Sequence, residues 1–215
     1  MLNVVTWKYP SPTGHRHYTA AHVNRFFRQF AGHYRRPYLA ICITDDPAGL
    51  DPGIEALPNP VTLPNNYRKL WLFSAAAARA IPGRIFLSDI DVDIVGDLTG
   101  LLDRDEDFVG WYDPRYPKVR WSTGNYLLTA GARAFVWEEF EELGADAAEN
   151  LLAAWYPRHR GMRKVGSDMA WLSYRLPAAE ARFGPGIYRR RFIDPSATPA
   201  DAKIIHYSGK KKPWN

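Results

Sequence analysis

The sequence is poor in cysteine and contains no long apolar run. Cys42 is the only cysteine among 215 residues, which excludes a disulfide framework and a zinc site built from cysteines. It lies in the apolar run 39–44, where we expect an inert core thiol. No stretch approaches the roughly 18 consecutive apolar residues of a membrane span, so we expect no membrane partner.

The sequence also begins without a targeting signal. Residues 1–10 enter an apolar run at once, with no basic leader and no small-residue cleavage site, and we therefore expect a cytoplasmic protein. Internal repeats, low-complexity tracts and long linkers are absent as well. With 46% hydrophobic and 24% charged residues, the composition is that of a globular protein. We predict a single domain over residues 1–215.

Charge is distributed unevenly along the chain. Residues 157–215 hold thirteen Lys and Arg against four Asp and Glu, a net charge of +9, whereas fifteen and nineteen in residues 1–156 give −4. A basic C-terminal quarter suits an anionic partner, such as a phosphate-bearing small molecule, a nucleic acid or an acidic surface. A solvated face of arginines is the alternative.

The first 44 residues predict a βαβ unit. The apolar run 2–7 is typical of a buried strand, and residues 38–44 of a second one. Between them, Thr19 is a candidate N-cap of a helix with one apolar face, formed by Val23, Phe26, Phe27 and Phe30. Two strands joined by such a crossover run parallel.

The rest of the chain continues the α/β pattern. We expect the Pro-rich segment 51–64 to run over the surface. The patterns that follow predict helices over 67–80, 133–143 and 168–176, and strands or extended segments over 84–88, 108–111, 125–129, 187–193 and 203–206.

Three acidic residues directly follow the predicted strand 84–88. If the segment is extended, Asp89, Asp91 and Asp93 project to the same side. Three such carboxylates repel one another unless a cation intervenes, and oxygen ligands of this kind suit Mg²⁺ or Mn²⁺. The alternative is a solvated acidic turn. The apolar strand before it favours a ligand site, because ligands of open α/β sheets bind at the carboxyl ends of strands.

The C-terminus holds a second group of functional residue types. An apolar strand is followed by His206, Gly209 and three lysines, and the segment closes with Pro213 and Trp214. Imidazole can bind a metal, glycine lets a phosphate approach the backbone, and lysines supply positive charge. A frayed basic tail is the alternative.

Both groups resemble motifs of known enzymes. Phe86–Leu98 resembles the Asp-x-Asp segment of the GT-A nucleotide-sugar glycosyltransferases. Residues 206–214 resemble the His-x-x-Gly-x-x-Lys-Pro-Trp ending of glycosyltransferase family 8, the group of glycogenin and the bacterial lipopolysaccharide galactosyltransferases. Residues 4–7, 43–49 and 67–70 are similar to small bacterial and phage members of this superfamily.

The resemblance implies a fold and an activity. The fold is an α/β, GT-A (Rossmann-like) domain with a mixed central sheet flanked by helices, in which residues 1–98 form the nucleotide-binding half and residues 99–215 the acceptor half. The activity is metal-dependent transfer of a hexose from a nucleoside diphosphate sugar, with a UDP-sugar expected, to an acceptor hydroxyl. Retention at the anomeric carbon is also implied.

The resemblance also assigns roles to individual residues. Asp89, Asp91 and His206 match the ligands of a Mn²⁺ or Mg²⁺ ion, and Asp93 binds through water or points elsewhere. The residues that match donor-binding positions are Gly209 and Lys212 at the diphosphate, Lys69 at a basic position facing the donor, and Thr6 and Trp7 at the nucleoside. Tyr9 either stacks on the base or packs on the surface.

Two segments depart from the family pattern. Where the family has Asn-Ser/Ala-Gly, this chain has Ser122-Thr-Gly-Asn125, so the role of that asparagine either passes to Asn125 or is lost. Where the family has Gly-Asp-Gln, this chain has Gly166-Ser-Asp-Met169, which keeps Asp168 but not the amide. Asn125 and Asp168 are therefore the candidate catalytic contacts to the donor sugar or the acceptor.

The acceptor stays open between a soluble glycan and a polyanion such as DNA bearing a hydroxymethyl base, which the arginines of the basic quarter would favour. His15 and His17 are candidates for a metal pair or an acceptor contact, or are solvated loop residues. The aromatic segment 111–121 is either an acceptor platform, including Lys118, or part of the core or of the surface. Two other functions compete: a non-catalytic nucleotide-sugar-binding module, and a haloacid-dehalogenase-like phosphatase with Asp89 as nucleophile.

Overall fold

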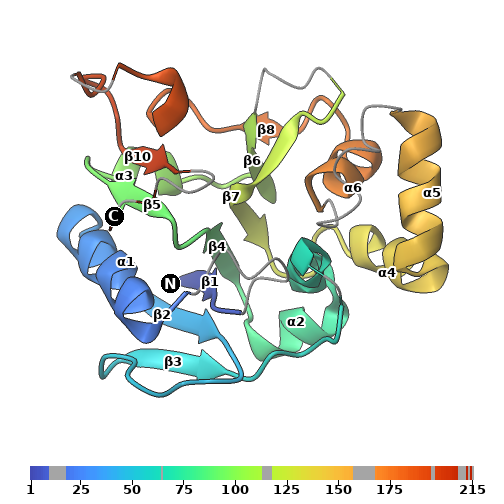
Figure 1. Cartoon of the computed structure of the whole chain (residues 1–215), viewed down its shortest axis with the longest axis horizontal. Coiled ribbons are helices and arrows are strands. Elements are labelled where there is room, and N and C mark those ends of the chain that lie inside the picture. The colour runs from blue at the N-terminus through green and yellow to red at the C-terminus, as the bar shows by residue number, and fades with distance from the viewer. Residues whose placement is uncertain are drawn as a thin grey trace. The chain divides into compact units, whose positions relative to one another are not determined.

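The computed structural model describes residues 1–9, 18–63, 65–112, 118–156, 168–194, 197–207, 212 and 214 (Figure 1). The chain forms two compact units. Unit 1 consists of Met1–Pro58, Phe86–Asp105 and Phe183–Asn215, and unit 2 of Asn59–Ile85 and Glu106–Arg182.

Strands and helices alternate along most of the chain. The strands are β1 (Leu2–Trp7), β2 (Tyr38–Ile43), β3 (Ile54–Leu57), β4 (Arg84–Ser88), β5 (Val92–Ile94), β6 (Phe108–Tyr112), β7 (Trp121–Thr129), β8 (Ala181–Arg182), β9 (Ile187–Arg189) and β10 (Ile204–His206). The α-helices are α1 (Ala20–His33), α2 (Ala75–Ala80), α3 (Thr99–Leu102), α4 (Phe135–Leu143), α5 (Ala145–Trp155) and α6 (Asp168–Arg175), and η1 (Asn65–Phe73) and η3 (Arg190–Phe192) are 3₁₀ helices.

The strands form two sheets. A seven-stranded sheet has the order β3-β2-β1-β4-β7-β6-β8, and a three-stranded sheet has the order β5-β10-β9. Both are mixed: β1, β2 and β3 run parallel, β6 and β7 antiparallel, and β10 pairs antiparallel with β5 and parallel with β9. The predicted mixed central sheet flanked by helices is confirmed.

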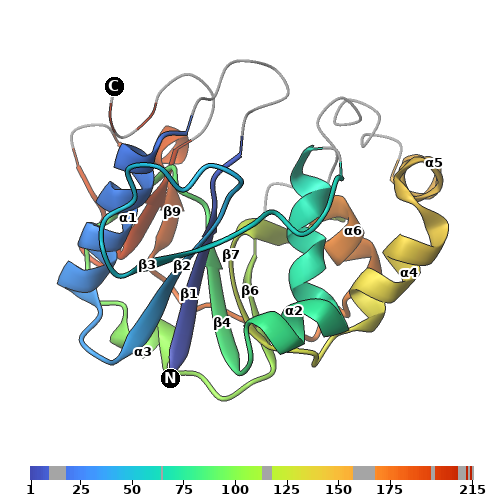
Figure 2. The same cartoon turned by 90° about the horizontal axis from the view of Figure 1, so that it is seen from below.

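The predicted βαβ unit opens unit 1. All six residues of β1 are buried, and β1 pairs in parallel with β2 from Leu2 opposite Tyr38 onward. Figures 1 and 2 show α1 lying along these strands. Its apolar face is the predicted one, because Val23, Phe26, Phe27 and Phe30 are buried. The helix begins after Thr19, whose backbone N–H donates to His22 Nδ1 at 3.1 Å.

Aromatic packing dominates the core of unit 2. Trp121 and Tyr126 of β7 and Phe108 of β6 are fully buried and in ring contact with one another or with Phe73. Gly110 makes room for them: a Cβ at this position would lie 2.5 Å from Cε3 of Trp121 and 2.9 Å from Cε1 of Phe108. The packing of two rings therefore depends on the absence of a side chain at one position.

Three predicted elements differ from the structure. The Pro-rich segment contains a short strand, β3, and the predicted helix 67–80 is a 3₁₀ helix followed by α2. Ser74 separates the two, and its Oγ caps α2 by accepting from the N–H of Ala77 at 2.9 Å. Helix α5 is an element that the sequence pattern did not predict. The extended segment predicted over 187–193 ends at Arg189, and η3 begins at Arg190.

Candidate active site

The acidic segment leaves β4 through a bend. Ser88 ends the strand, the backbone bends at Ile90 and Asp91, and β5 begins only at Val92. The expected extended conformation over residues 89–93 is therefore wrong, and side-chain alternation does not set the directions of the three carboxylates. Asp91 is buried, at 6% exposure, whereas Asp89 is partly exposed.

Asp93 is held by three side chains of unit 1. Arg25 pairs with its Oδ1, Gln29 Nε2 donates to the same oxygen at 3.2 Å, and the hydroxyl of Tyr207 donates to Oδ2 at 2.7 Å. Arg25 also donates to the carbonyl of Val92 at 3.0 Å. Burial, and then the hydrogen bond to Asp93, raise the pKa of Tyr207 to about 12. Both oxygens of Asp93 thus fix β5 against α1 and the segment after β10.

Pairing of β10 with β5 brings the two ends of the predicted metal site together. His206 lies opposite Val92, and the N–H of the next residue, Tyr207, donates to the carbonyl of Asp91 at 2.9 Å. His206 is 3% exposed. Residues 114 positions apart in sequence are therefore backbone neighbours.

A lysine ammonium contacts the buried carboxylate. Lys212 Nζ pairs with Asp91 Oδ2, and the two side chains are 7% and 8% exposed. Lys212 lies under the ring of Tyr18, with Nζ 6.0 Å from its centroid. A buried carboxylate needs such a partner, because an isolated charge in the interior is strongly disfavoured.

The residues present suit a divalent cation in kind. Asp89 and Asp91 offer carboxylate oxygens and His206 offers an imidazole nitrogen, a donor set that accepts Mn²⁺ or Mg²⁺. Within the described part of the chain, however, no three His, Cys, Asp or Glu side chains are arranged so as to hold a metal ion. The metal triad therefore stays a prediction.

The candidate nucleoside residues lie at the end of β1. Thr6 Oγ1 donates to the carbonyl of Ser88 at 3.0 Å and thereby ties the ends of β1 and β4 together. Trp7 is 3% exposed, so its ring belongs to the core, and Tyr9 is partly exposed. Between them, Lys8 pairs with Asp46 at 2.7 Å.

The other candidate residues lie in unit 2. Lys69 of η1, Asn125 of β7 and Asp168 at the start of α6 are all buried, at 6%, 0% and 1% exposure. Helix α6 packs against both β7 and η1. Asp168 Oδ1 accepts from the N–H of Met169 at 2.9 Å. Three buried polar side chains are thus supplied by three elements of one unit.

Strand β7 is interrupted where the sequence departs from the family pattern. Gly110 pairs with Tyr126, but the next residue of β6, Trp111, pairs with Ser122. Three residues of β7, ending with Asn125, therefore have no counterpart on β6. Such bulges redirect side chains and are frequent next to functional sites. The displaced asparagine thus coincides with a local rearrangement of the strand.

Some of the remaining candidates lie outside the part of the chain that the structure describes, and others are buried or bonded elsewhere. Gly209, His15 and His17 lie outside the described residues. Trp111 and Trp121 of the proposed aromatic platform are buried, at 9% and 0% exposure, which favours the core interpretation. Lys118 Nζ donates to the carbonyl of Trp155 at 3.1 Å.

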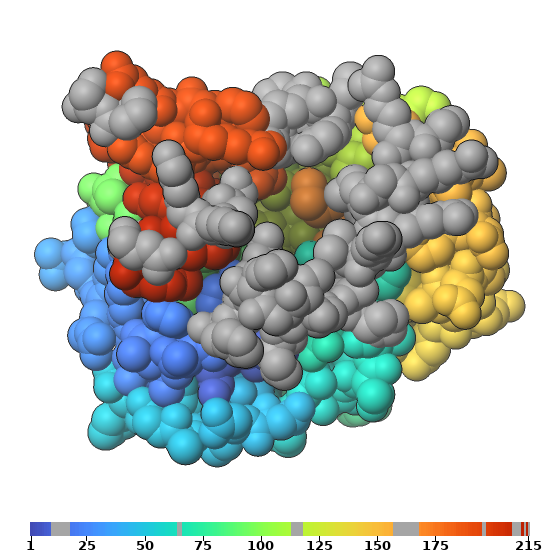
Figure 3. Space-filling model, in the orientation of Figure 1, coloured from blue at the N-terminus to red at the C-terminus, as the bar shows by residue number. Residues whose placement is uncertain are grey.

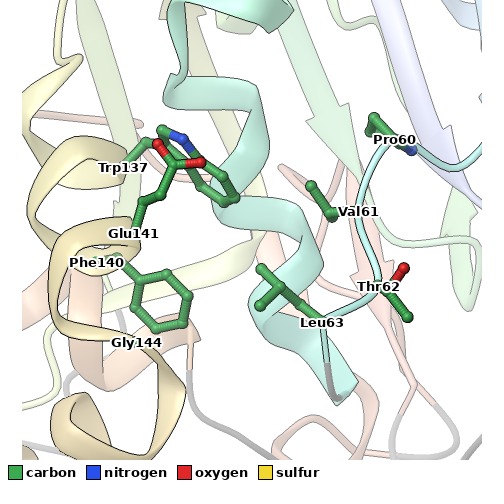
Figure 4. A pocket seen from close by; sticks show the side chains of 8 residues that line it. All are labelled: Pro60, Val61, Thr62, Leu63, Trp137, Phe140, Glu141 and Gly144. Carbon is green, nitrogen blue, oxygen red and sulfur yellow. The ribbon is translucent and has the colours of Figure 1, made fainter.

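A pocket of about 350 Å³ lies in unit 2 (Figure 4). It opens between helix α4 and the segment that precedes η1. One carboxylate, that of Glu141, lies among otherwise uncharged side chains in its lining, which consists of Pro60, Val61, Thr62, Leu63, Trp137, Phe140, Glu141 and Gly144. None of the candidate donor, metal or catalytic residues lines it.

The chain has the fold of the GT-A glycosyltransferases. It is similar over 100% of its length to the solved structure of the galactosyltransferase LgtC in complex with donor and acceptor sugar analogues, with a TM-score of 0.64 and 14% identity, and it covers 90% of that chain. The structure of an active-site mutant of LgtC is similar over 100% of this chain and 90% of the mutant's chain, with a TM-score of 0.59 and 14% identity. No protein-family model and no curated protein sequence matches this chain.

No helix within the described ranges combines the length and the apolar character that a membrane crossing requires.

Proposed function

We propose that the protein is a glycosyltransferase that transfers a hexose from a nucleoside diphosphate sugar, with a UDP-sugar as the expected donor, to an acceptor hydroxyl. The observation that carries the proposal is the meeting of the acidic segment and the C-terminal segment at one place, where β10 pairs with β5 and Lys212 contacts Asp91. These are the two motifs by which the sequence resembles glycosyltransferase family 8. The GT-A fold supports the same function.

Asp89, Asp91 and His206 would hold Mn²⁺ or Mg²⁺ in this enzyme. The metal would supply Lewis-acid stabilisation of the negative charge that develops on the departing diphosphate. Lys212 and Gly209 would bind the diphosphate, with Lys212 supplying a full positive charge to the same developing anion. Thr6 and Trp7 would support the nucleoside side of the site through the ends of β1 and β4.

The described residues of unit 2 would position the reacting groups. Asn125 and Asp168 are buried polar side chains suited to hydrogen bonds with sugar hydroxyls, and Lys69 is a third polar group of the same unit. No nucleophile on the far face of the donor is assigned. We therefore propose retention by attack of the acceptor hydroxyl on the face from which the diphosphate leaves.

The acceptor that we propose to test first is polyanionic. Arg189, Arg190 and Arg191 follow one another at the end of β9 and in η3, and Arg191 is exposed. Such a group of cations suits DNA bearing a hydroxymethyl base, and a soluble glycan is the alternative. Strong salt dependence of binding to duplex DNA is expected for the first acceptor and not for the second.

The test is a panel of UDP- and GDP-linked sugars, each with and without Mn²⁺, in which sugar release and thermal stabilisation are measured. Asp91→Asn is the test variant. Asp105→Asn is the matched control, because it makes the same change at an exposed carboxylate of unit 1. One donor should raise the thermal stability of the parent and of the control, and both proteins should hydrolyse it, in each case only when metal is present. Asp91→Asn should show neither the stabilisation nor the hydrolysis.

Two other results lead to different conclusions. Donor binding without turnover, whatever acceptor is offered, would favour a non-catalytic nucleotide-sugar-binding module. If no nucleotide sugar shifts the protein and Asp91→Asn behaves as the parent does, the glycosyltransferase proposal is wrong.

A further inference from the structure

Asp91 is a buried carboxylate with a cation already in contact with it. Lys212 supplies that cation from within the chain, and both side chains are more than nine-tenths buried. A metal ligand that is buried without a metal must have its charge compensated by another group. We propose that Lys212 is the resident counter-ion of Asp91 in the metal-free protein, and that a divalent cation must compete with Lys212 for this carboxylate. The inference rests on the proposed function, since it concerns the same site.

The position of Lys212 is fixed by its surroundings. Two residues further along the chain, the ring of Trp214 stacks on His22 with centroids 4.0 Å apart and an angle of 21° between the planes. The ring of Tyr18 meets Trp214 edge-on at 6.1 Å and also faces Lys212. In Figure 3 the red C-terminal residues lie against the blue helix α1, from whose first turn His22 projects. Trp214 is thus anchored to α1, and Lys212 to Asp91.

The proposed function gives Lys212 a second partner. If the ammonium binds the diphosphate of a donor, it must give up at least part of its contact with Asp91, which then becomes available to a cation. Binding of the diphosphate and binding of the cation therefore both weaken the contact between Lys212 and Asp91, and each favours the other. Coupling of this kind is reciprocal, so a nucleoside diphosphate should tighten metal binding by the same factor by which the metal tightens nucleotide binding.

The test measures Mn²⁺ binding directly, through the electron paramagnetic resonance signal of free Mn²⁺, with UDP absent or present. Lys212→Met should bind Mn²⁺ alone about tenfold or more tightly than the parent, because the competing charge has gone. UDP should tighten Mn²⁺ binding less in this variant than in the parent. Lys203→Met is the matched control, since it removes a lysine of unit 1 that has no contact with Asp91 within the described residues, and it should bind Mn²⁺ as the parent does.

A second variant covers the case in which Lys212→Met does not fold. Trp214→Ala removes the stack on His22 but keeps Lys212, and it should tighten Mn²⁺ binding by about two- to threefold, because the loss of this ring contact weakens the hold on Lys212.

The possible failures can be told apart. If the parent binds Mn²⁺ and UDP together but Lys212→Met and Trp214→Ala bind Mn²⁺ alone no more tightly than the parent, the counter-ion role is refuted and the proposed function stands. If neither the parent nor any variant binds Mn²⁺, with or without UDP, the metal site of the proposed function is refuted and the competition with it.

Discussion

Replacing Asp93 by asparagine should destabilise the protein by about 1–2 kcal/mol, a value that follows from its three partners. Arg25 and Gln29 both donate to Oδ1, so the single oxygen of asparagine must take that place and its amide must face Tyr207. The tyrosine hydroxyl can turn round and accept from the amide. The variant therefore loses mainly the negative charge that strengthens the bond to Arg25. The side chains of Arg25 and Asp93 are 24% and 20% exposed, so this loss of stability is well below that of a fully buried ion pair.

Urea denaturation at equilibrium measures this loss. Asp93→Asn should shift the midpoint to lower urea without changing the slope, and Asp105→Asn should stay within about 0.5 kcal/mol of the parent. A double-mutant cycle with Tyr207→Phe should show coupling, because the two side chains share a hydrogen bond. Equal midpoints for Asp93→Asn and the parent would refute the reasoning, and Asp93 would again be open to a role at the metal.

Three further predictions concern packing and titration. Gly110→Ala should destabilise the protein by about 1–3 kcal/mol, because the new methyl group clashes with Trp121. Gly32→Ala should be neutral or stabilising by up to about 1 kcal/mol, because nothing lies within 4 Å of its new methyl group. Chemical denaturation measures both changes, and equal effects of the two variants would contradict the packing at Gly110. Cys42 is fully buried and its pKa is raised by burial to about 12, so Ellman's reagent should detect no thiol in the native protein at pH 8 and one in guanidinium chloride; rapid native reaction would contradict its burial. Tyr207 has a pKa in the folded protein above the usual 10.0, so its contribution to stability is fully present below pH 10 and is lost as the pH rises towards about 12. Tyr207→Phe should therefore lose less stability over that interval than the parent. Identical profiles of stability against pH would refute the raised pKa of Tyr207.

Strands β1 and β4 of the central sheet could be predicted because all but one of their residues are buried. Leu2–Trp7 and Arg84–Ser88 have apolar residues at most of their positions, and the structure places β1 and β4 there. Strand β3 is different, since Ile54–Leu57 has only four residues, none of them fully buried, in a segment rich in proline. In Asn65–Phe73 the apolar spacing is similar for an α-helix and a 3₁₀ helix, so it did not predict that η1 ends at Phe73 and that α2 begins after the cap at Ser74.

The sequence motifs of the site could be predicted, but the side-chain contacts within it could not. Asp91 and His206 could be selected as residue types that bind metals, and the pairing of β10 with β5 makes them backbone neighbours. The engagement of Asp93 by Arg25 and Tyr207 joins three segments distant in sequence, and no local pattern indicates it. The i, i+4 spacing of Arg25 and Gln29 beside the apolar face of α1 is the one signal that could have suggested a shared partner.

The pairing of β5 with β10 also has a consequence for how the protein is made. On the ribosome, Val92–Ile94 emerges about 110 residues before its partner, Ile204–His206, and the whole of unit 2 is synthesised before β10 appears. Closing so long a loop is slow compared with forming local contacts. Unit 2 can therefore fold while the acidic segment still lacks its β10 partner and its lysine counter-ion. The amide of Tyr207, which bonds to Asp91, would then be among the last to gain protection from exchange during refolding.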